Sequence, residues 1–185
     1  GAVKSVFLAH KKPLDKIDVI HCDAASLSSV NLLKVILKDY GLSPRLEPFD
    51  NYLQAEEQNA VLLIGNPGIE FLKRHHEHQI LDLGQAWKDL TGLPFVFAVW
   101  AIRRDQSNSE LRQMLMKAKK KGTGKLTDII KNHSDFDFEL RDLYFRKHIR
   151  FELTNHEKKG ILEFVRRLRE VVGEPIFIPN YVSAN

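Results

Sequence analysis

The sequence contains one cysteine, Cys22, and no long hydrophobic run. A single cysteine excludes a disulfide framework within the chain and is typical of a reducing compartment, so we expect a cytoplasmic location. The longest apolar stretch, LPFVFAVWAI from Leu93, has the length of a strand and falls short of the roughly 18–20 residues of a membrane span. The first residues also lack the pattern of a signal peptide. We therefore predict no membrane partner.

Repeats, low-complexity segments and a strong excess of one charge are also missing. The chain has 28 Lys and Arg against 24 Asp and Glu, a net charge of +4. Most of the excess lies in the tract from Lys117 to Lys125, which has no aromatic residues between its charges. We expect this tract to be a solvated helix end, with no nucleic-acid partner. The small net charge is compatible with an anionic small molecule as ligand.

What the chain does contain is a globular composition, with short apolar runs that alternate with helical patterns. Its 185 residues, 43% of them hydrophobic, suit one domain or two small lobes. The expected strands are residues 3–10, 18–23, 45–49, 60–65, 94–102 and 149–153, and the expected helices are residues 30–41, 82–92, 108–121, 135–147 and 156–172. This alternation predicts an α/β fold with a mostly parallel sheet, followed by a helical half from about Arg104.

Local signals mark several element boundaries. Ser28 or Ser29 is the expected N-cap of the first helix, and Gly41 is its expected left-handed end. Thr154 and Glu157 have the spacing of a capping box before the last helix. Asn66-Pro67-Gly68 is expected to form a turn. Ser107 or Asn108 is expected to cap the helix that follows Arg104. The next helix is expected to begin at Thr123 or Thr127.

Two clusters of reactive side chains are interpreted as surface. Lys121 to Lys125 (KGTGK) resembles part of a phosphate loop, but Lys119 and Leu126 stand where that loop needs Gly and then Ser or Thr. His75 and His78 could hold zinc from one helical face, yet no third ligand is near in sequence. We therefore expect a polar surface turn there and no metal.

The segment from Asp23 to Val30 (DAASLSSV) joins a strand to a helix. A helix N-terminus exposes unpaired N–H groups and the positive end of the helix dipole. Ser26, Ser28 and Ser29 add hydroxyl donors, so a carboxylate or phosphate can bind there without a charged side chain. Simple N-capping uses only one serine and leaves the others unexplained, so both interpretations stay open.

A longer pattern, DLGQAWKDLTGLPFVFAVWA, begins at Asp82. Together with VLLIGNPGI (Val61–Ile69) and SLSSVNLL (Ser26–Leu33), it resembles the menaquinone-biosynthesis family of MqnA and MqnD enzymes over nearly the whole chain. Thr91 to Trp100 is similar to the MqnA pattern TGLPFVFA-W. MqnD enzymes carry a catalytic histidine where this chain has Gly65, so the resemblance is to the MqnA side of the family.

The resemblance implies a fold and a reaction. MqnA proteins have a fold like type II periplasmic binding proteins, with two lobes and a hinge. They are hydro-lyases of the futalosine route that remove water from chorismate to give 3-[(1-carboxyvinyl)oxy]benzoate, with neither metal nor organic cofactor. The implied partner is thus a small-molecule substrate, and a homo-oligomer stays open.

The resemblance also implies substrate-binding residues, which are Ser26, Ser28, Ser29, Gly65, Asn66, Pro94 and Phe95. Ser28 and Ser29 match the family's ligand-binding pair, and Gly65 and Asn66 match a turn that lines the cleft. Asn66 replaces the family's usual Asp, which removes a formal charge. The Pro94-Phe95 segment would form an apolar wall beside the hinge. The elimination needs a base and an acid, and the residues that serve as either are not identified.

Lobe boundaries follow from the same resemblance. Residues 11–93 would form the second lobe, and residues 1–10 with 94–185 would form the hinge strands and the C-terminal part of the first lobe. MqnA chains begin with a further segment that this sequence lacks, so we expect an incomplete sequence or a truncated homologue with an unfinished first lobe. Two alternative functions remain: a binding protein that holds a small anionic aromatic ligand without turnover, and the cyclic dehypoxanthine futalosine synthase activity of MqnD.

Overall fold

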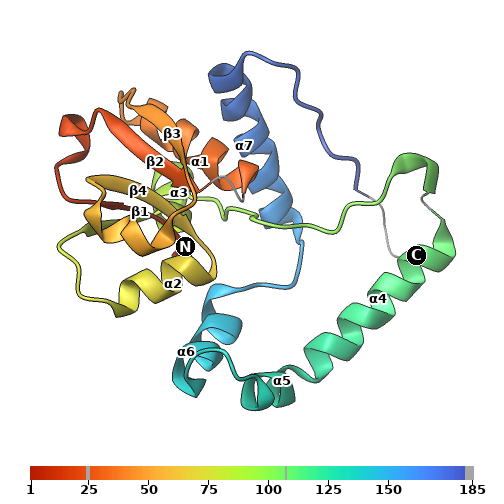
Figure 1. Cartoon of the computed structure of the whole chain (residues 1–185). Coiled ribbons are helices and arrows are strands. Elements are labelled where there is room, and N and C mark those ends of the chain that lie inside the picture. The colour runs from red at the N-terminus through yellow and green to blue at the C-terminus, as the bar shows by residue number, and fades with distance from the viewer. Residues whose placement is uncertain (24–25, 107, 182–185) are drawn as a thin grey trace. The chain divides into compact units, whose positions relative to one another are not determined.

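The computed structural model describes residues 1–23, 26–106 and 108–181 (Figure 1). The chain divides into two compact units, one of residues 1–97 with 153–177 and the other of residues 98–152 with the tail from 178. The first unit holds a five-stranded sheet flanked by helices. The described part of the second unit consists of helices and irregular segments. The lobe boundaries expected from the sequence stay a prediction.

The sheet has the strand order β3-β2-β4-β1-β5. Its strands are β1 (Val6–His10), β2 (Val19–Asp23), β3 (Arg45–Phe49), β4 (Ala60–Ile64) and β5 (Gln79–Asp82). β2 runs parallel to β3 and β4, whereas β1 runs antiparallel to β4 and β5. The α/β prediction is confirmed. Four of the five strands run in the same direction, as a mostly parallel sheet requires, and β1 alone runs against them. A strand's direction depends on its connections and not on its apolar pattern, so the sequence pattern did not reveal the reversal of β1.

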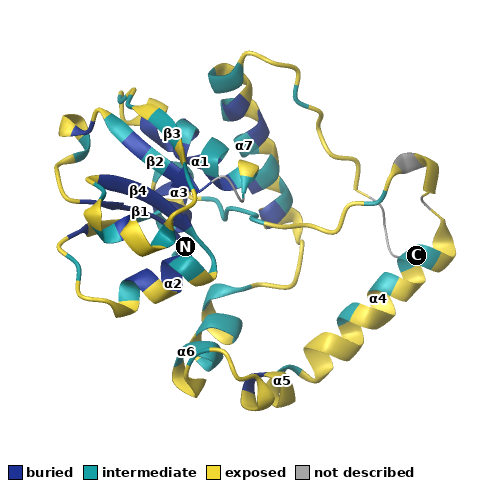
Figure 2. Cartoon of the chain, viewed as in Figure 1, coloured by how far each residue is buried: buried dark blue, intermediate teal, exposed yellow. Residues whose placement is uncertain are grey.

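Helices cover both faces of this sheet. One face packs against α1 (Leu27–Asp39), α3 (Leu83–Thr91) and α7 (Asn155–Val172), and the other packs against α2 (Asn66–Lys73) and the 3-10 segment η2 (Tyr52–Glu57). Side chains of β1 alternate between the two cores, with Leu8 in the first and Phe7 and Ala9 in the second. The central strands β1 and β4 are accordingly almost entirely buried, whereas the edge strands β3 and β5 contain no fully buried residue (Figure 2).

Two expected boundaries near the sheet are corrected by the structure. Ser26, and neither Ser28 nor Ser29, is the N-cap of α1, because the helix already begins at Leu27. Asn66-Pro67-Gly68 forms the first turn of α2 instead of a free turn. Proline is well suited to a first helical turn, since its missing N–H would be unpaired there anyway. The left-handed end of α1 at Gly41, with φ of +70°, is confirmed.

The expected strands at residues 94–102 and 149–153 are irregular segments in the structure. The first part of the segment at 94–102 packs against helices instead of pairing as a strand, whereas Val99 and Trp100 further along are exposed. Phe95 lies edge-on to Trp87 of α3 and to Phe164 of α7, with ring centroids 5.7 and 4.9 Å away. An apolar run that is only partly covered by helices has the same composition as a buried strand, so the pattern misled the prediction.

The long helix α7 begins at the predicted capping box. Glu157 accepts a hydrogen bond from the backbone N–H of Thr154 at 3.0 Å, and the Thr154 hydroxyl accepts one from the N–H of His156 at 3.2 Å. The helix ends at Gly173, whose φ is +66°. Its start and end were therefore both predictable from local sequence.

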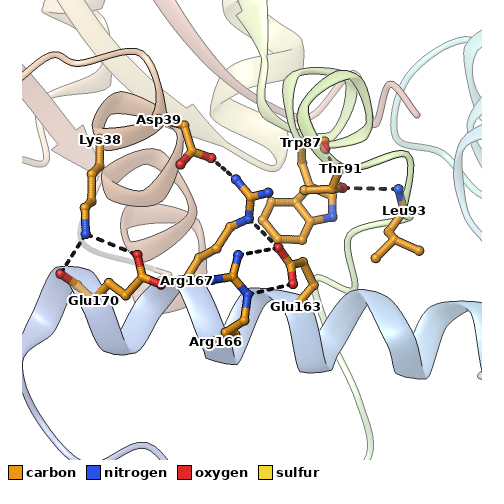
Figure 3. Close-up of polar contacts among 9 residues, drawn as sticks. All are labelled: Lys38, Asp39, Trp87, Thr91, Leu93, Glu163, Arg166, Arg167 and Glu170. Atoms are coloured by element: carbon orange, nitrogen blue, oxygen red, sulfur yellow. Dashed lines mark hydrogen bonds and ion pairs between the residues drawn. The ribbon is translucent and has the colours of Figure 1, made fainter.

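Charged side chains of α7 interact with residues of α1 and α3 (Figure 3). Arg167 of α7 pairs with Asp39 at the end of α1, and it also bonds Glu163 at 2.6 Å. Its guanidinium lies 5.8 Å from the ring centre of buried Trp87, within cation–π range. The Arg166 guanidinium, with help from Arg167, lowers the pKa of Glu163 to about 2. We call Asp39, Glu163, Arg166 and Arg167 the α7 clamp.

The second unit contains α4 (Ser109–Gly124), α5 (Leu126–Asn132), α6 (Phe138–Leu143) and a π-helical turn (Tyr144–His148). Asn108 caps α4, as predicted, by accepting a hydrogen bond from the N–H of Leu111 at 2.8 Å, and the alternative cap Ser107 lies outside the described residues. The predicted start of the next helix at Thr123 or Thr127 is wrong, because α5 follows α4 directly after Lys125. None of the helices in the described ranges is long and apolar enough to cross a membrane.

Candidate functional site

Several segments that are distant in sequence end at one edge of the sheet. β2, β4 and β5 run in the same direction, and α1, α2 and α3 begin after their respective carboxyl ends. The pairs Val6–Ile64 and Phe7–Asp82 place the start of β1 between the ends of β4 and β5. We call this side of the sheet the strand-end edge. Ligands of open α/β sheets bind at the carboxyl ends of strands, so it is the candidate site.

The three predicted serines gather at the start of α1. The Ser26 hydroxyl accepts a hydrogen bond from the N–H of Ser29 at 3.3 Å, and it lies 3.1 Å from the Ser28 hydroxyl and 3.0 Å from the Ser29 hydroxyl. Ser29 is buried, whereas Ser26 and Ser28 are half-buried. Ser26 thus does the capping, and Ser28 is left with a partly exposed hydroxyl beside the helix N-terminus. N-capping explains one serine of the three.

Gly65 and Asn66 lie at the end of the neighbouring strand β4. Gly65 has φ of +68° and ψ of −141°, a backbone conformation that glycine adopts readily and other residues avoid. Its N–H donates to the carbonyl oxygen of Ser5 at 2.6 Å, which ties the turn to the segment before β1. Asn66 is exposed and opens α2. The structure therefore brings both residues to the strand-end edge, as it does the serines.

Asp82, at the end of β5, has two roles that the sequence analysis did not assign. Its carboxylate caps α3 by accepting a hydrogen bond from the N–H of Gln85 at 3.0 Å. The same carboxylate accepts hydrogen bonds from the N–H groups of Val3 at 3.0 Å and Lys4 at 2.8 Å. An Asp directly before a helix is a recognisable capping signal. Its second role depends on β1 and β5 pairing, which no local signal shows.

Asp23, the last residue of β2, is a buried carboxylate at the same edge, with only 2% of its surface exposed. The Tyr52 hydroxyl donates a hydrogen bond to it. Burial raises the pKa of Tyr52, and the bond to Asp23 raises it further. An acidic residue that directly follows the apolar positions of a strand was the available sequence signal for this pair.

Comparison with known proteins decides the family. The sequence model for menaquinone biosynthesis matches residues 1–170. The chain belongs to this menaquinone biosynthesis family. A relative from Thermus thermophilus, named chorismate dehydratase, is 30% identical over 204 residues, which cover 97% of this chain and 73% of the relative. The resemblance seen in the sequence is thereby confirmed.

The fold has a solved counterpart in the crystal structure of protein AF1704 from Archaeoglobus fulgidus. The two structures match with a TM-score of 0.64 at 21% identity, over 91% of this chain and 68% of that protein. At this identity the likeness shows the fold alone. The mixed α/β architecture of this family member is therefore shared with a distant protein.

Pro94 and Phe95, the remaining predicted site residues of this family member, lie after α3 and away from the serines in sequence. The carbonyl oxygen of Pro94 lies against Gly160 of α7. Phe95 packs against Phe97 at 4.7 Å, in addition to its contacts with Trp87 and Phe164. These contacts belong to the packing between α3 and α7, and a substrate role for either residue stays a prediction.

The two clusters that were interpreted as surface differ in outcome. Residues 121–125 are exposed at the end of α4, as expected. In the histidine segment, His75 is exposed, but His78 is 7% exposed and its Nε2 bonds the carbonyl oxygen of Gln58 at 2.8 Å. The surface prediction is therefore wrong for His78. No group of three or more potential metal ligands occurs among the residues that the structure describes.

Proposed function

We propose that this protein is a chorismate dehydratase, a hydro-lyase that converts chorismate to 3-[(1-carboxyvinyl)oxy]benzoate and water. The observation that carries the proposal is the relative named chorismate dehydratase, which aligns with 97% of this chain at 30% identity. Family membership over residues 1–170 supports the same assignment. The reaction would belong to the futalosine route, as the sequence resemblance implies, and take place in the cytoplasm, as the single cysteine suggests.

The strand-end edge has the chemistry that a dianionic substrate requires. Chorismate carries two carboxylates, and the N-termini of α1 and α2 present N–H groups and positive dipole ends at this edge. We assign Ser28, Ser29, Gly65 and Asn66 to one substrate carboxylate, with Ser26 holding the two serines through its hydroxyl. Pro94-Phe95 would supply apolar contact to the ring from the hinge side.

The reaction is an elimination in which atoms balance without a redox partner. A base removes the proton from the ring carbon that bears the ether. The electron pair of the broken C–H bond forms a new double bond between this carbon and the next ring carbon. The hydroxyl on that next carbon leaves and is protonated to water. Aromatisation of the ring makes the step favourable. Holding the carboxylates in one orientation places the two reacting bonds for this loss.

The MqnD activity is disfavoured by the backbone at Gly65. MqnD enzymes have a catalytic histidine at this position, and a histidine would be strained at φ of +68° and ψ of −141°. The family's two-lobe arrangement, like that of type II periplasmic binding proteins, is part of the proposal. In it, residues 11–93 form one lobe, and residues 1–10 with 94–185 form the hinge strands and part of the other.

Product analysis tests the proposal. Purified protein is incubated with chorismate, and the mixture is followed by liquid chromatography and mass spectrometry. We expect a new species lighter than chorismate by one water, formed faster than in protein-free and heat-denatured controls. Absence of turnover, with chorismate still raising the melting temperature, would favour the binding protein instead. Conversion of cyclic dehypoxanthine futalosine would favour MqnD chemistry.

A further inference from the structure

Lys4 lies at the strand-end edge, directly before β1. β1 pairs with β4 so that Val6 is opposite Ile64, and the N–H of Gly65 bonds the carbonyl oxygen of Ser5. Lys4 directly precedes Ser5, so its backbone lies next to the turn at Gly65. Lys4 therefore borders the turn that the proposed function assigns to a substrate carboxylate.

The backbone of Lys4 is held in an unusual conformation. Its φ is +66°, in the left-handed region, and the only other non-glycine residue with positive φ in the described ranges is Phe136. This conformation is unfavourable for a residue with a Cβ. It is held on both sides, because Asp82 accepts hydrogen bonds from the N–H groups of Val3 and Lys4, and Ser5 is only 3% exposed. The edge thus positions Lys4 firmly although its side chain is exposed.

The charge of Lys4 is available for a ligand. Among the described residues, its ammonium takes part in no ion pair. Two acidic side chains are near in the fold, but the Asp82 carboxylate is occupied by backbone N–H groups, and Asp23 is buried with Tyr52 as a hydrogen-bond partner. Lys4 is also the one Lys or Arg in the segments 1–5, 26–29, 64–68 and 82–85 that form the edge.

We infer that the Lys4 ammonium is a substrate-binding group that pairs with a carboxylate of the dianionic substrate. This inference rests on the proposed function, since it concerns the same site. The helix N-termini supply partial charges and neutral donors, and Lys4 adds the full positive charge that those groups lack. Asn66 at the start of α2 is a neutral amide, so it does not compete with the substrate carboxylate for the ammonium.

The test compares four proteins in steady-state turnover of chorismate. Lys4→Asn removes the charge but keeps a side chain that tolerates positive φ, and Lys4→Arg retains the charge. Lys12→Asn is the matched control, since Lys12 is exposed and follows the opposite end of β1. We expect Lys4→Asn to raise KM at least fivefold, Lys4→Arg to stay within twofold of wild type, and Lys12→Asn to leave KM unchanged. Added salt should raise KM of wild type more than that of Lys4→Asn.

The outcomes separate the two levels of the proposal. If wild type turns over chorismate and Lys4→Asn has the same KM and salt dependence as Lys12→Asn, the Lys4 inference is overturned and the proposed function stands. If wild type neither converts chorismate nor gains thermal stability from it, the proposed function fails. The Lys4 inference, which rests on that function, then fails as well. A Lys4→Gly variant controls for loss of stability, because glycine adopts the positive φ of this position without strain. A Lys4→Gly protein that melts no lower than wild type yet has a raised KM would support the role of the charge.

Discussion

The backbone of Pro94 and the α-carbon of Gly160 lie in direct contact, so that a Cβ on Gly160 would overlap the carbonyl oxygen of Pro94. This contact joins the segment that leaves α3 to the helix α7. Both belong to the first unit, although they are far apart in the chain. The aromatic cluster of Trp87, Phe95 and Phe164 packs around the same crossing.

Gly160→Ala should destabilise the protein. The added methyl group meets a backbone atom that cannot rotate away, so we expect a loss of about 1–3 kcal/mol in the free energy of unfolding. Gly122→Ala in α4 is the control, because its Cβ would have no heavy atom within 4 Å. That control should gain up to about 1 kcal/mol from helix propensity. Urea denaturation measures both, and equal stability of Gly160→Ala and wild type would contradict the contact.

Arg167→Met tests the α7 clamp. Arg167 is largely covered, with 21% of its side chain exposed, and its removal leaves Asp39 without this partner and takes the guanidinium from the Trp87 ring. We expect a loss of about 1–3 kcal/mol in unfolding free energy. Arg166→Met is the comparison, since Arg166 is 57% exposed and should matter far less. Equal losses in the two variants would contradict the larger role assigned to Arg167 in the α7 clamp.

Glu163 should make stability depend on pH in the acid range. Its folded pKa of about 2 is below the ordinary value of 4.5, mainly because Arg166 and then Arg167 hydrogen-bond its charged form. The resulting stabilisation is complete above about pH 4.5 and is lost as the pH falls toward about 2. Glu163→Gln should therefore be less stable than wild type at neutral pH, and the difference should shrink across this window. Parallel acid-unfolding curves for the two proteins would refute this.

His78 should produce a second pH effect, at milder acidity. Burial lowers its pKa below 6.5, and Lys11, His76 and His10 lower it further, while the bond to Gln58 opposes the shift. The unfolded chain then binds the proton more readily, so stability falls as the pH drops below about 6.5. His78→Gln should flatten this part of the stability curve. His75→Gln, at an exposed position, is the control and should leave the slope as in wild type.

Substitutions of the serines at α1 should distinguish a role in helix capping from a role in substrate binding. Ser26→Ala removes the N-cap and should cost about 1 kcal/mol of stability. Ser28→Ala should leave the unfolding free energy nearly unchanged and weaken chorismate binding, measured by calorimetry or by the thermal shift. Full chorismate affinity in Ser28→Ala would remove Ser28 from the proposed site.

Much of the first unit could be predicted from local sequence, because local signals determine local structure. The capping box at Thr154, the left-handed glycines at Gly41 and Gly92 and the buried strand β4 all follow from a few adjacent residues. The serine-rich start of α1 was recognised as a candidate anion site for the same reason, although the capping serine was misassigned. The sequence predictions fail where an apolar run has two explanations, as at Phe95, whose packing depends on α7 far along the chain.

By itself, the sequence determined the family of this protein, both ends of α7 and the cluster of serines before α1. Only the tertiary structure decided that Lys4, Gly65 and Asp82 meet at one edge, and that Asp82 holds the backbone of Lys4. The physical reason is the strand order β3-β2-β4-β1-β5, with β1 antiparallel to its neighbours. Pairing between strands that are distant in the chain places these residues side by side, and that pairing reflects the packing of the whole sheet, which no local pattern encodes.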